Sequence, residues 1–252
     1  MNARSLWLGL LILGLAAAIA GQEKKSAPHW TYTGAEGPAK WGALDSSFAT
    51  CKTGKEQSPI DIRNPQKATL APIQFNYKPV PLKVIDNGHT VQVNYAPGST
   101  ITVGDHKYEL KQFHFHHPSE EKVNGQAFDM VAHLVHGGAD GKLAVVAVLL
   151  KQGQANSAIQ AVWDHVPKQK GVETAAEGVT INAADLLPEA RAYYTFAGSL
   201  TTPPCSEGVT WFVLKSASAI SPQQLATFAK LYPLNARPTQ ALEGRVVKVS
   251  EQ

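Results

Sequence analysis

Three histidines in two short apolar segments constrain this 252-residue chain more than any other feature. His114 and His116 lie in the sequence Gln-Phe-His-Phe-His, and His133 follows seventeen residues later. Side chains alternate between the two faces of a strand, so residues two apart point the same way. Seventeen residues suffice for one strand to end, turn and bring a third histidine back on its neighbour. The pattern predicts three imidazoles that converge from paired strands.

Such a cluster is suited to binding Zn²⁺ with one coordination position left open. Structural zinc sites fill all four positions with protein ligands, whereas catalytic sites keep one for water or substrate. We therefore expect a catalytic zinc site with His114, His116 and His133 as ligands. Two further histidines in the same segments, His117 and His136, should point to the opposite face and not bind the metal.

The first twenty residues (1–20) are typical of a secretory signal peptide. Arg4 gives a positive start, an apolar stretch follows, and Ala18 to Ala20 form a small-residue cleavage signal. The apolar stretch is short for a membrane span. We expect residues 21–252 to form one periplasmic or secreted domain without stable membrane insertion. An uncleaved N-terminal anchor remains the alternative.

The charge of the chain is small and dispersed. The formal net charge is +3 and the isoelectric point is about 8.7. Neither a basic cluster nor a low-complexity linker follows residue 40, so the sequence argues against a nucleic-acid partner. The length fits a single β-rich domain.

The chain contains two cysteines, Cys51 and Cys205. In a secreted chain an even number of cysteines favours a disulfide. This bridge would close a long loop and stabilise the fold by roughly 5 kcal/mol at most, because it restricts the unfolded chain. Two buried free thiols are the alternative interpretation.

Strand patterns dominate the middle of the sequence. Alternating or continuous apolar residues predict strands at 82–86, 90–95, 101–103, 108–116, 130–136, 143–150, 193–198 and 209–214. The run at 143–150 is apolar throughout, as expected of a strand buried on both faces. Helices are predicted at 155–166 and after Ser221, where Pro222 and Gln224 offer a capping box. We expect a mainly β domain with a large, mostly antiparallel, twisted central sheet and short peripheral helices.

The histidine motifs belong to a longer series of segments that resembles the α-class carbonic anhydrases. The series runs in the family's order over nearly all of residues 29–248, and Pro118-Ser119-Glu120 resembles the bacterial secreted branch. A lone His-x-His would be weak, but seven segments in order are specific. These segments are residues 30–32, 57–62, 87–89, 112–116, 133–136, 199–204 and 209–211.

The resemblance implies reversible hydration of carbon dioxide to bicarbonate and a proton by a zinc-bound hydroxide. The three histidines would hold the zinc. Thr201 would donate a hydrogen bond to Glu120 and so be left to accept one from the hydroxide, which orients the nucleophile. His89 would carry the released proton away, since histidine titrates near neutral pH.

Further residues match family positions around the metal. An apolar substrate needs an apolar pocket, and strand alternation alone places Val135 on the face of His133. By resemblance, the pocket is formed by Val135, Val145, Leu200 and Trp211, with Thr202 beside the substrate. Gln112 would accept a hydrogen bond from a ligand, and Tyr32 and Gln92 would order water.

One position departs from the family pattern. The residue two before the third ligand is commonly a glutamate that accepts a hydrogen bond from that ligand, and here it is Val131. Such partners hold metal-bound histidines in place, and losing one typically lowers metal affinity or activity 10–100-fold. We therefore expect weaker zinc retention, unless another acceptor substitutes.

Two other functions would use the same fold: a catalytically silent binding module and a periplasmic metal-binding protein. Silent members of the family lack one or more ligands, whereas this chain keeps all three, with Thr201, Glu120 and His89. A metal buffer would need neither the Leu-Thr-Thr-Pro-Pro segment nor the apolar pocket. The sequence favours the enzyme and leaves a homodimer open.

Overall fold

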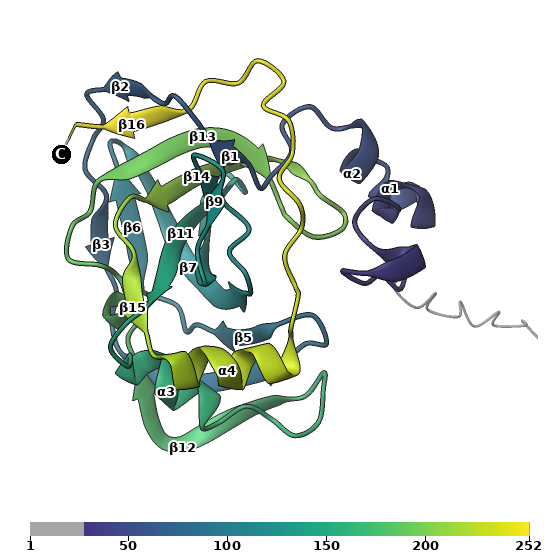
Figure 1. Ribbon diagram of the computed structural model, residues 1–252. Helices are drawn as coiled ribbons and strands as arrows, with labels where there is room; N and C mark the ends of the chain where they lie inside the picture. Colours follow the sequence, from purple (N-terminus) through teal and green to yellow (C-terminus); the bar gives the residue numbers. More distant parts are fainter. Residues whose placement is uncertain (1–27, 252) are drawn as a thin grey trace, which may run out of the picture.

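A twisted sheet of thirteen strands forms the centre of the computed structural model, which describes residues 28–251 (Figure 1). The predicted signal peptide lies outside the described residues. Most strand pairs are antiparallel, and β11 pairs with β14 and β15, and β16 with β2, in parallel. This confirms the predicted fold class. The strands are β2 (Gln66–Ala68), β3 (Gln74–Asn76), β4 (Val80–Asp86), β5 (Val91–Asn94), β6 (Thr100–Val103), β7 (His106–His116), β10 (Met130–Gly138), β11 (Leu143–Gln152), β12 (Glu173–Ile181), β13 (Tyr193–Ser199), β14 (Glu207–Leu214), β15 (Ser218–Ile220) and β16 (Lys248–Ser250).

The order of the strands places the longest and most apolar ones in the middle. The main path is β12-β4-β5-β7-β10-β11-β14-β13-β16-β2, and β3, β6 and β15 pair to its side. A small second sheet contains β1 (Asp61–Ile62), β8 (Lys122–Val123) and β9 (Gln126–Ala127). All eight predicted strands are present, most of them one or two residues longer than expected.

The sheet separates two apolar clusters, and β11 contributes to both. Val146 and Val148 face the larger cluster, whereas Val145 and Ala147 face the smaller one. All four are buried, which is why the strand has no polar face and its sequence is apolar throughout. The smaller cluster lies on the histidine face of the sheet and also includes Ile60 from the segment before β1.

Short helices lie outside the sheet, and two of them pack over the larger cluster, where Trp163 and Phe228 contact Phe115 of β7. The helices are α1 (Trp41–Leu44), α2 (Thr50–Thr53), α3 (Ser157–Trp163) and α4 (Pro222–Leu231), with the 3₁₀ helices η1 (Gly34–Glu36), η2 (Ser46–Phe48) and η3 (Ala183–Leu186). In Figure 1, α3 and α4 lie together near β12. Within residues 28–251, no helix combines the length and apolar character needed to cross a membrane.

The two predicted helices begin where their capping residues indicate. The Ser221 hydroxyl accepts a hydrogen bond from the Gln224 backbone amide, and the Gln224 side-chain oxygen accepts one from the Ser221 backbone amide, so α4 has the expected capping box. The helix predicted at 155–166 is shorter: the Asn156 side chain caps its start by accepting from the Ile159 amide, and the helix ends at Trp163.

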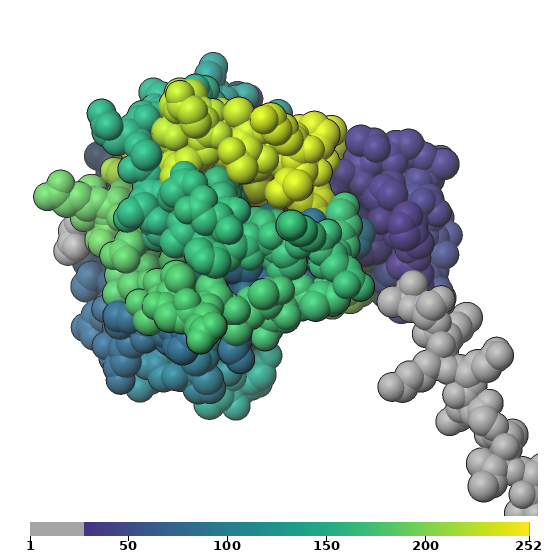
Figure 2. Space-filling view, turned by 90° about the horizontal axis from the view of Figure 1, so that it is seen from below, coloured from purple at the N-terminus to yellow at the C-terminus, as the bar shows by residue number. Residues whose placement is uncertain are grey.

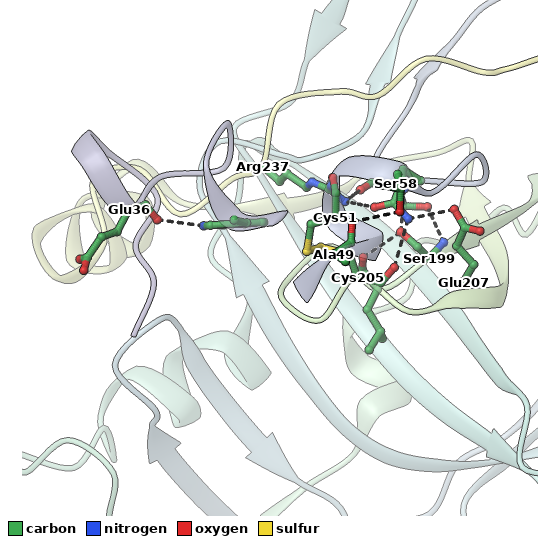
Figure 3. Close-up of a disulfide and its surroundings, with 12 residues drawn as sticks. Glu36, Ala49, Cys51, Ser58, Ser199, Cys205, Glu207 and Arg237 are labelled. Carbon is green, nitrogen blue, oxygen red and sulfur yellow. Dashed lines mark hydrogen bonds between the residues drawn. A yellow bond between two sulfur atoms is a disulfide. The ribbon is translucent and has the colours of Figure 1, made fainter. Parts of the chain in front are cut away.

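A disulfide between Cys51 and Cys205 ties the N-terminal helices to the loop after β13, as predicted. The Cα atoms are 5.0 Å apart and 154 residues separate them in sequence. Figure 2 shows the N-terminal segment (purple) as a lobe at one end, against C-terminal residues (yellow). Beside the bridge, the buried Arg237 donates to the carbonyls of Cys51 and Ser58, at 3.1 and 2.7 Å (Figure 3).

Removing this bridge should destabilise the chain through its unfolded state. We expect the double variant Cys51→Ala/Cys205→Ala to lose about 2–5 kcal/mol in free energy of unfolding. Denaturant unfolding of both proteins, with and without reductant, provides the measurement. Reductant should lower the stability of the wild type and leave the variant unchanged; equal stability of the two oxidised proteins would contradict the prediction.

Candidate active site and metal centre

The three histidines converge because β7 and β10 pair in one register. His133 lies directly opposite His114 in the antiparallel ladder, and His116 lies two residues further along β7. Ring centroids are 5.0 Å apart for His114 and His116, 5.5 Å for His114 and His133, and 4.7 Å for His116 and His133. One nitrogen of each ring lies within 4.8 Å of the other two. The spacing is that of a cluster able to share one metal ion.

Each imidazole is held by its other nitrogen. The Nδ1 atom of His114 lies 2.8 Å from Oε1 of Gln112, and Nδ1 of His116 lies 2.7 Å from the backbone oxygen of Asn235. The Nε2 atom of His133 lies 3.0 and 3.2 Å from the two carboxylate oxygens of Glu121. These oxygens accept, so the ring nitrogens donate. The nitrogens left with lone pairs are Nε2 of His114, Nε2 of His116 and Nδ1 of His133.

The site fits a metal ion such as Zn²⁺. The Nε2 atom of His116 is buried and has no hydrogen-bond partner among the described residues. A buried polar atom without a partner is unfavourable, and a metal bond would satisfy it. Three imidazole nitrogens form a donor set that zinc accepts, and the fourth position would remain for a small molecule.

Burial keeps two of the rings neutral. Burial, with a contribution from His133, lowers the pKa of His114 to about 3, although the residue is partly exposed. The same two causes, and His114, lower the pKa of His116 well below its usual value. Burial also lowers the pKa of His133, but the carboxylates of Glu121 and Glu120 outweigh it and raise the pKa overall. Neutral imidazole is the form that binds a metal.

Glu120 is a buried acid beside the cluster. Its Oε1 accepts from the backbone amide of Arg237 at 2.8 Å, and its Oε2 lies 3.5 Å from Nε2 of His116. Burial raises the pKa of the carboxyl to about 7, and Glu121 adds to this. His133, the nearby Thr201 hydroxyl and the Arg237 amide act in the opposite direction. Thr201 is itself buried and lies in the loop after β13.

The apolar residues predicted for the pocket come together on the histidine face. Val135 pairs with Val145 across β10 and β11, and Val145 pairs with Trp211 across β11 and β14. The Trp211 ring lies 4.9 Å from the ring of His133, and its indole nitrogen donates to the backbone oxygen of Ser199. Leu200 packs against this group and Thr202 remains partly exposed.

His89 is placed outside the metal cluster. It is half-buried and stacks on the Trp30 indole, with ring centroids 3.7 Å apart and an interplanar angle of 6°. Burial, with His29 and Lys170, lowers the pKa of His89. The ring is therefore largely neutral at pH 7 and able to accept a proton.

The two polar residues expected to order water come from different parts of the fold. Gln92 faces His114 across β5 and β7, and its side chain donates to Asn94. Tyr32 packs edge-on against Trp30 and Trp41. Burial, and then Glu120, raises the pKa of the Tyr32 phenol, so the group remains a neutral donor.

The other two histidines of the motifs are occupied elsewhere. His136 is buried with its Nε2 atom 2.8 Å from the hydroxyl of Tyr77. His117 lies with Nδ1 2.9 Å from the backbone oxygen of Asp129. Neither belongs to the three-histidine cluster.

We expect weak zinc retention at His133 unless another acceptor replaces the missing glutamate at position 131, and the structure contains such an acceptor. Val131 is buried among apolar residues and offers no acceptor, but Glu121 takes the hydrogen bond instead. From the sequence we predict the consequence of the apolar residue at 131 and miss the acid at 121, which is the signal that could identify the acceptor. Two other residues were also missed, Asn235 and Arg237, because no sequence pattern links them to sites more than 100 residues away.

Comparisons with known proteins agree with this geometry. The family described as eukaryotic-type carbonic anhydrase matches residues 36–251. A carbonic anhydrase from Nostoc sp. is 40% identical over 247 residues, covering 95% of this chain and 94% of the relative. A hyperthermostable carbonic anhydrase from a hydrothermal vent chimney has a TM-score of 0.86 and 43% identity, covering 88% of this chain and all of that one. The Thermovibrio ammonificans α-carbonic anhydrase, solved with the inhibitor sulfanilamide, has a TM-score of 0.84 and 41% identity, covering 89% and 100%.

Removal of one histidine from the cluster should abolish stable metal binding. We expect about one zinc per wild-type chain after dialysis and close to none for His116→Ala, because two ligands rarely retain the ion. Elemental analysis gives the stoichiometry. His106→Ala serves as the control, since His106 begins the same strand but is exposed and outside the cluster. Equal zinc contents in the two variants would refute the assignment.

Proposed function

Because the chain belongs to the eukaryotic-type, or α-class, carbonic anhydrase family of enzymes, we propose that it catalyses the reversible hydration of carbon dioxide to bicarbonate and a proton. The observation that carries the proposal is the convergence of three ring nitrogens within 4.8 Å, each on an imidazole whose other nitrogen is engaged by the protein. His114, His116 and His133 would hold Zn²⁺.

Held by His114, His116 and His133, zinc would supply a hydroxide nucleophile near neutral pH, since the pKa of zinc-bound water in carbonic anhydrases is known to be about 7. The protein's contribution begins with the ligand set. Neutral rings leave the ion's full charge to act on water, and the low pKa values of His114 and His116 keep these rings neutral.

Thr201 and Glu120 would aim the nucleophile. A carboxylate accepts hydrogen bonds only, so a threonine hydroxyl that donates to it has its lone pairs left to accept. The hydroxyl can then fix the direction of the attacking oxygen. The position of Glu120 supports this role, because the Arg237 amide holds one carboxylate oxygen. A bound dication would favour the charged form of Glu120, whose pKa is otherwise raised.

Carbon dioxide would be received by the apolar wall beside the metal. The molecule is apolar and small, so it gains from a dry surface. The paired side chains of Val135, Val145 and Trp211 supply one, and Leu200 packs against them. Thr202 would lie at the edge of this wall.

His89 would take the proton to bulk water. It lies outside the metal cluster and would need a chain of waters, for which Tyr32 and Gln92 provide polar groups near the site. Its lowered pKa keeps the ring ready to accept a proton, and stacking on Trp30 holds it at the protein surface. The disulfide also supports a periplasmic or secreted location, where such bonds persist.

The activity itself is tested by stopped-flow hydration of carbon dioxide with the zinc-loaded mature chain. We expect catalysis that falls roughly 100-fold or more when zinc is removed and returns when it is restored. Sulfanilamide, which the Thermovibrio ammonificans relative binds, should inhibit it. A zinc-loaded chain without activity would point to a silent binding module or a metal-binding protein instead.

The role of His89 has a separate test. In dilute buffer His89→Ala should lower kcat by roughly tenfold or more and change kcat/KM less, because proton export follows product formation. Added imidazole should restore turnover. His29→Ala is the matched control, since His29 is a nearby, largely exposed histidine. A variant with the turnover of the wild type would eliminate His89 as the proton carrier.

A further inference from the structure

The third metal-binding histidine depends on an acid that lies outside its own strand. Both carboxylate oxygens of Glu121 lie within hydrogen-bond distance of Nε2 of His133, at 3.0 and 3.2 Å. Glu121 has no exposed surface and His133 has 1%. A buried carboxylate needs a donor, and a buried imidazole N–H needs an acceptor, so each group satisfies the other.

The backbone around Glu121 is fixed independently of the metal cluster. The Ser119 hydroxyl donates to the carbonyl of Glu121 at 2.7 Å and accepts from the Phe128 amide at 2.8 Å. On the other side, the amide of Lys122 donates to the carbonyl of Ile60 at 3.2 Å. The segment between β7 and β8 therefore presents the carboxylate from a braced backbone.

On β10 itself, the place from which an acceptor could reach His133 holds an apolar side chain. Val131 lies two residues before His133 and so on the same face of the strand. It is fully buried in the smaller apolar cluster, where it pairs with Leu149 of β11. The two positions, 121 and 131, thus approach the same histidine from different elements.

We propose that Glu121 is the positioning residue for His133, and that it does what an acid at position 131 could do from the strand of His133 itself. The inference rests on the proposed zinc site. By accepting from Nε2, Glu121 fixes the tautomer in which Nδ1 faces the metal, and it strengthens Nδ1 as a donor. Because Val131 occupies the alternative position, no second acid competes for the same N–H.

A carboxylate at position 131 should then be able to replace that of Glu121. The test uses zinc-loaded protein and compares Glu121→Ala, the near-isosteric Glu121→Gln, Val131→Glu and the double variant Glu121→Ala/Val131→Glu. Zinc loss to excess dipicolinate is followed by elemental analysis, and imidazole ¹⁵N–¹H spectra report the tautomer of His133. Glu177→Ala, which removes an exposed acid on β12, is the control.

We expect zinc loss to be roughly 10–100-fold faster in Glu121→Ala, with loss of the His133 Nε2–H signal. Glu121→Gln should fall between this variant and the wild type, because an amide oxygen still accepts but carries no charge. The double variant should recover both the slow zinc loss and the Nε2–H signal. Val131→Glu alone should not slow zinc loss, since the N–H is already engaged.

Wild-type zinc retention in both Glu121 variants would overturn the proposal, as would a folded double variant without recovery. If Glu121→Ala does not fold, Glu121→Gln and its ¹⁵N–¹H spectrum decide the matter. The proposed function fails in a different way, through a wild-type chain that retains zinc but does not hydrate carbon dioxide.

Discussion

The register of the β7–β10 ladder is the constraint on which the site depends. It places His133 opposite His114 and Val135 opposite Gln112, so ligands and wall are set by one pairing. Side chains alternate along a strand, so a slip of one strand by one residue would turn the histidines of that strand into the apolar core. The phenylalanines between the histidines oppose such a shift, because Phe113 and Phe115 fill the larger cluster on the other face.

A correct register still leaves three imidazoles, each with a second nitrogen that needs an acceptor. The three acceptors lie at very different separations in sequence from their histidines. Gln112 lies two residues from His114, Glu121 lies 12 residues from His133, and the Asn235 carbonyl lies 119 residues from His116. All three rings therefore have their acceptors only when the C-terminal segment that contains Asn235 is packed in place. Asn235 also holds this segment, because its side-chain amide donates to the carbonyls of His89 and Phe115.

The parts of this protein that could be predicted from sequence are those governed by a local period or by family resemblance. Alternation identified the strands and put His114, His116 and His133 on one face, and the capping residues located the start of α4. Resemblance supplied the roles proposed for Thr201, Glu120 and His89. The acceptors Asn235 and Glu121 were not predicted, since contacts between irregular segments produce no periodic pattern in the sequence. Val131 in place of an acid predicted weaker zinc retention, because that prediction considered only residues on the strand of His133. The acceptor comes instead from the segment that follows β7.

The adjacent acids Glu120 and Glu121 thus both lie against the histidine cluster, and different residues hold each of them in place. Glu120 is held by the amide of Arg237, whose guanidinium is buried and donates to the carbonyls of Cys51 and Ser58 beside the disulfide. Burial lowers the pKa of Arg237 to about 10, against the opposing charge of Glu120, and the guanidinium still carries its charge at neutral pH. Glu121, by contrast, is fixed through the Ser119 hydroxyl. Because the two carboxylates have different hydrogen-bond partners, exchanging the acceptor for His133 leaves the Arg237 contact of Glu120 in place and removes the contribution of Glu121 to the raised pKa of Glu120.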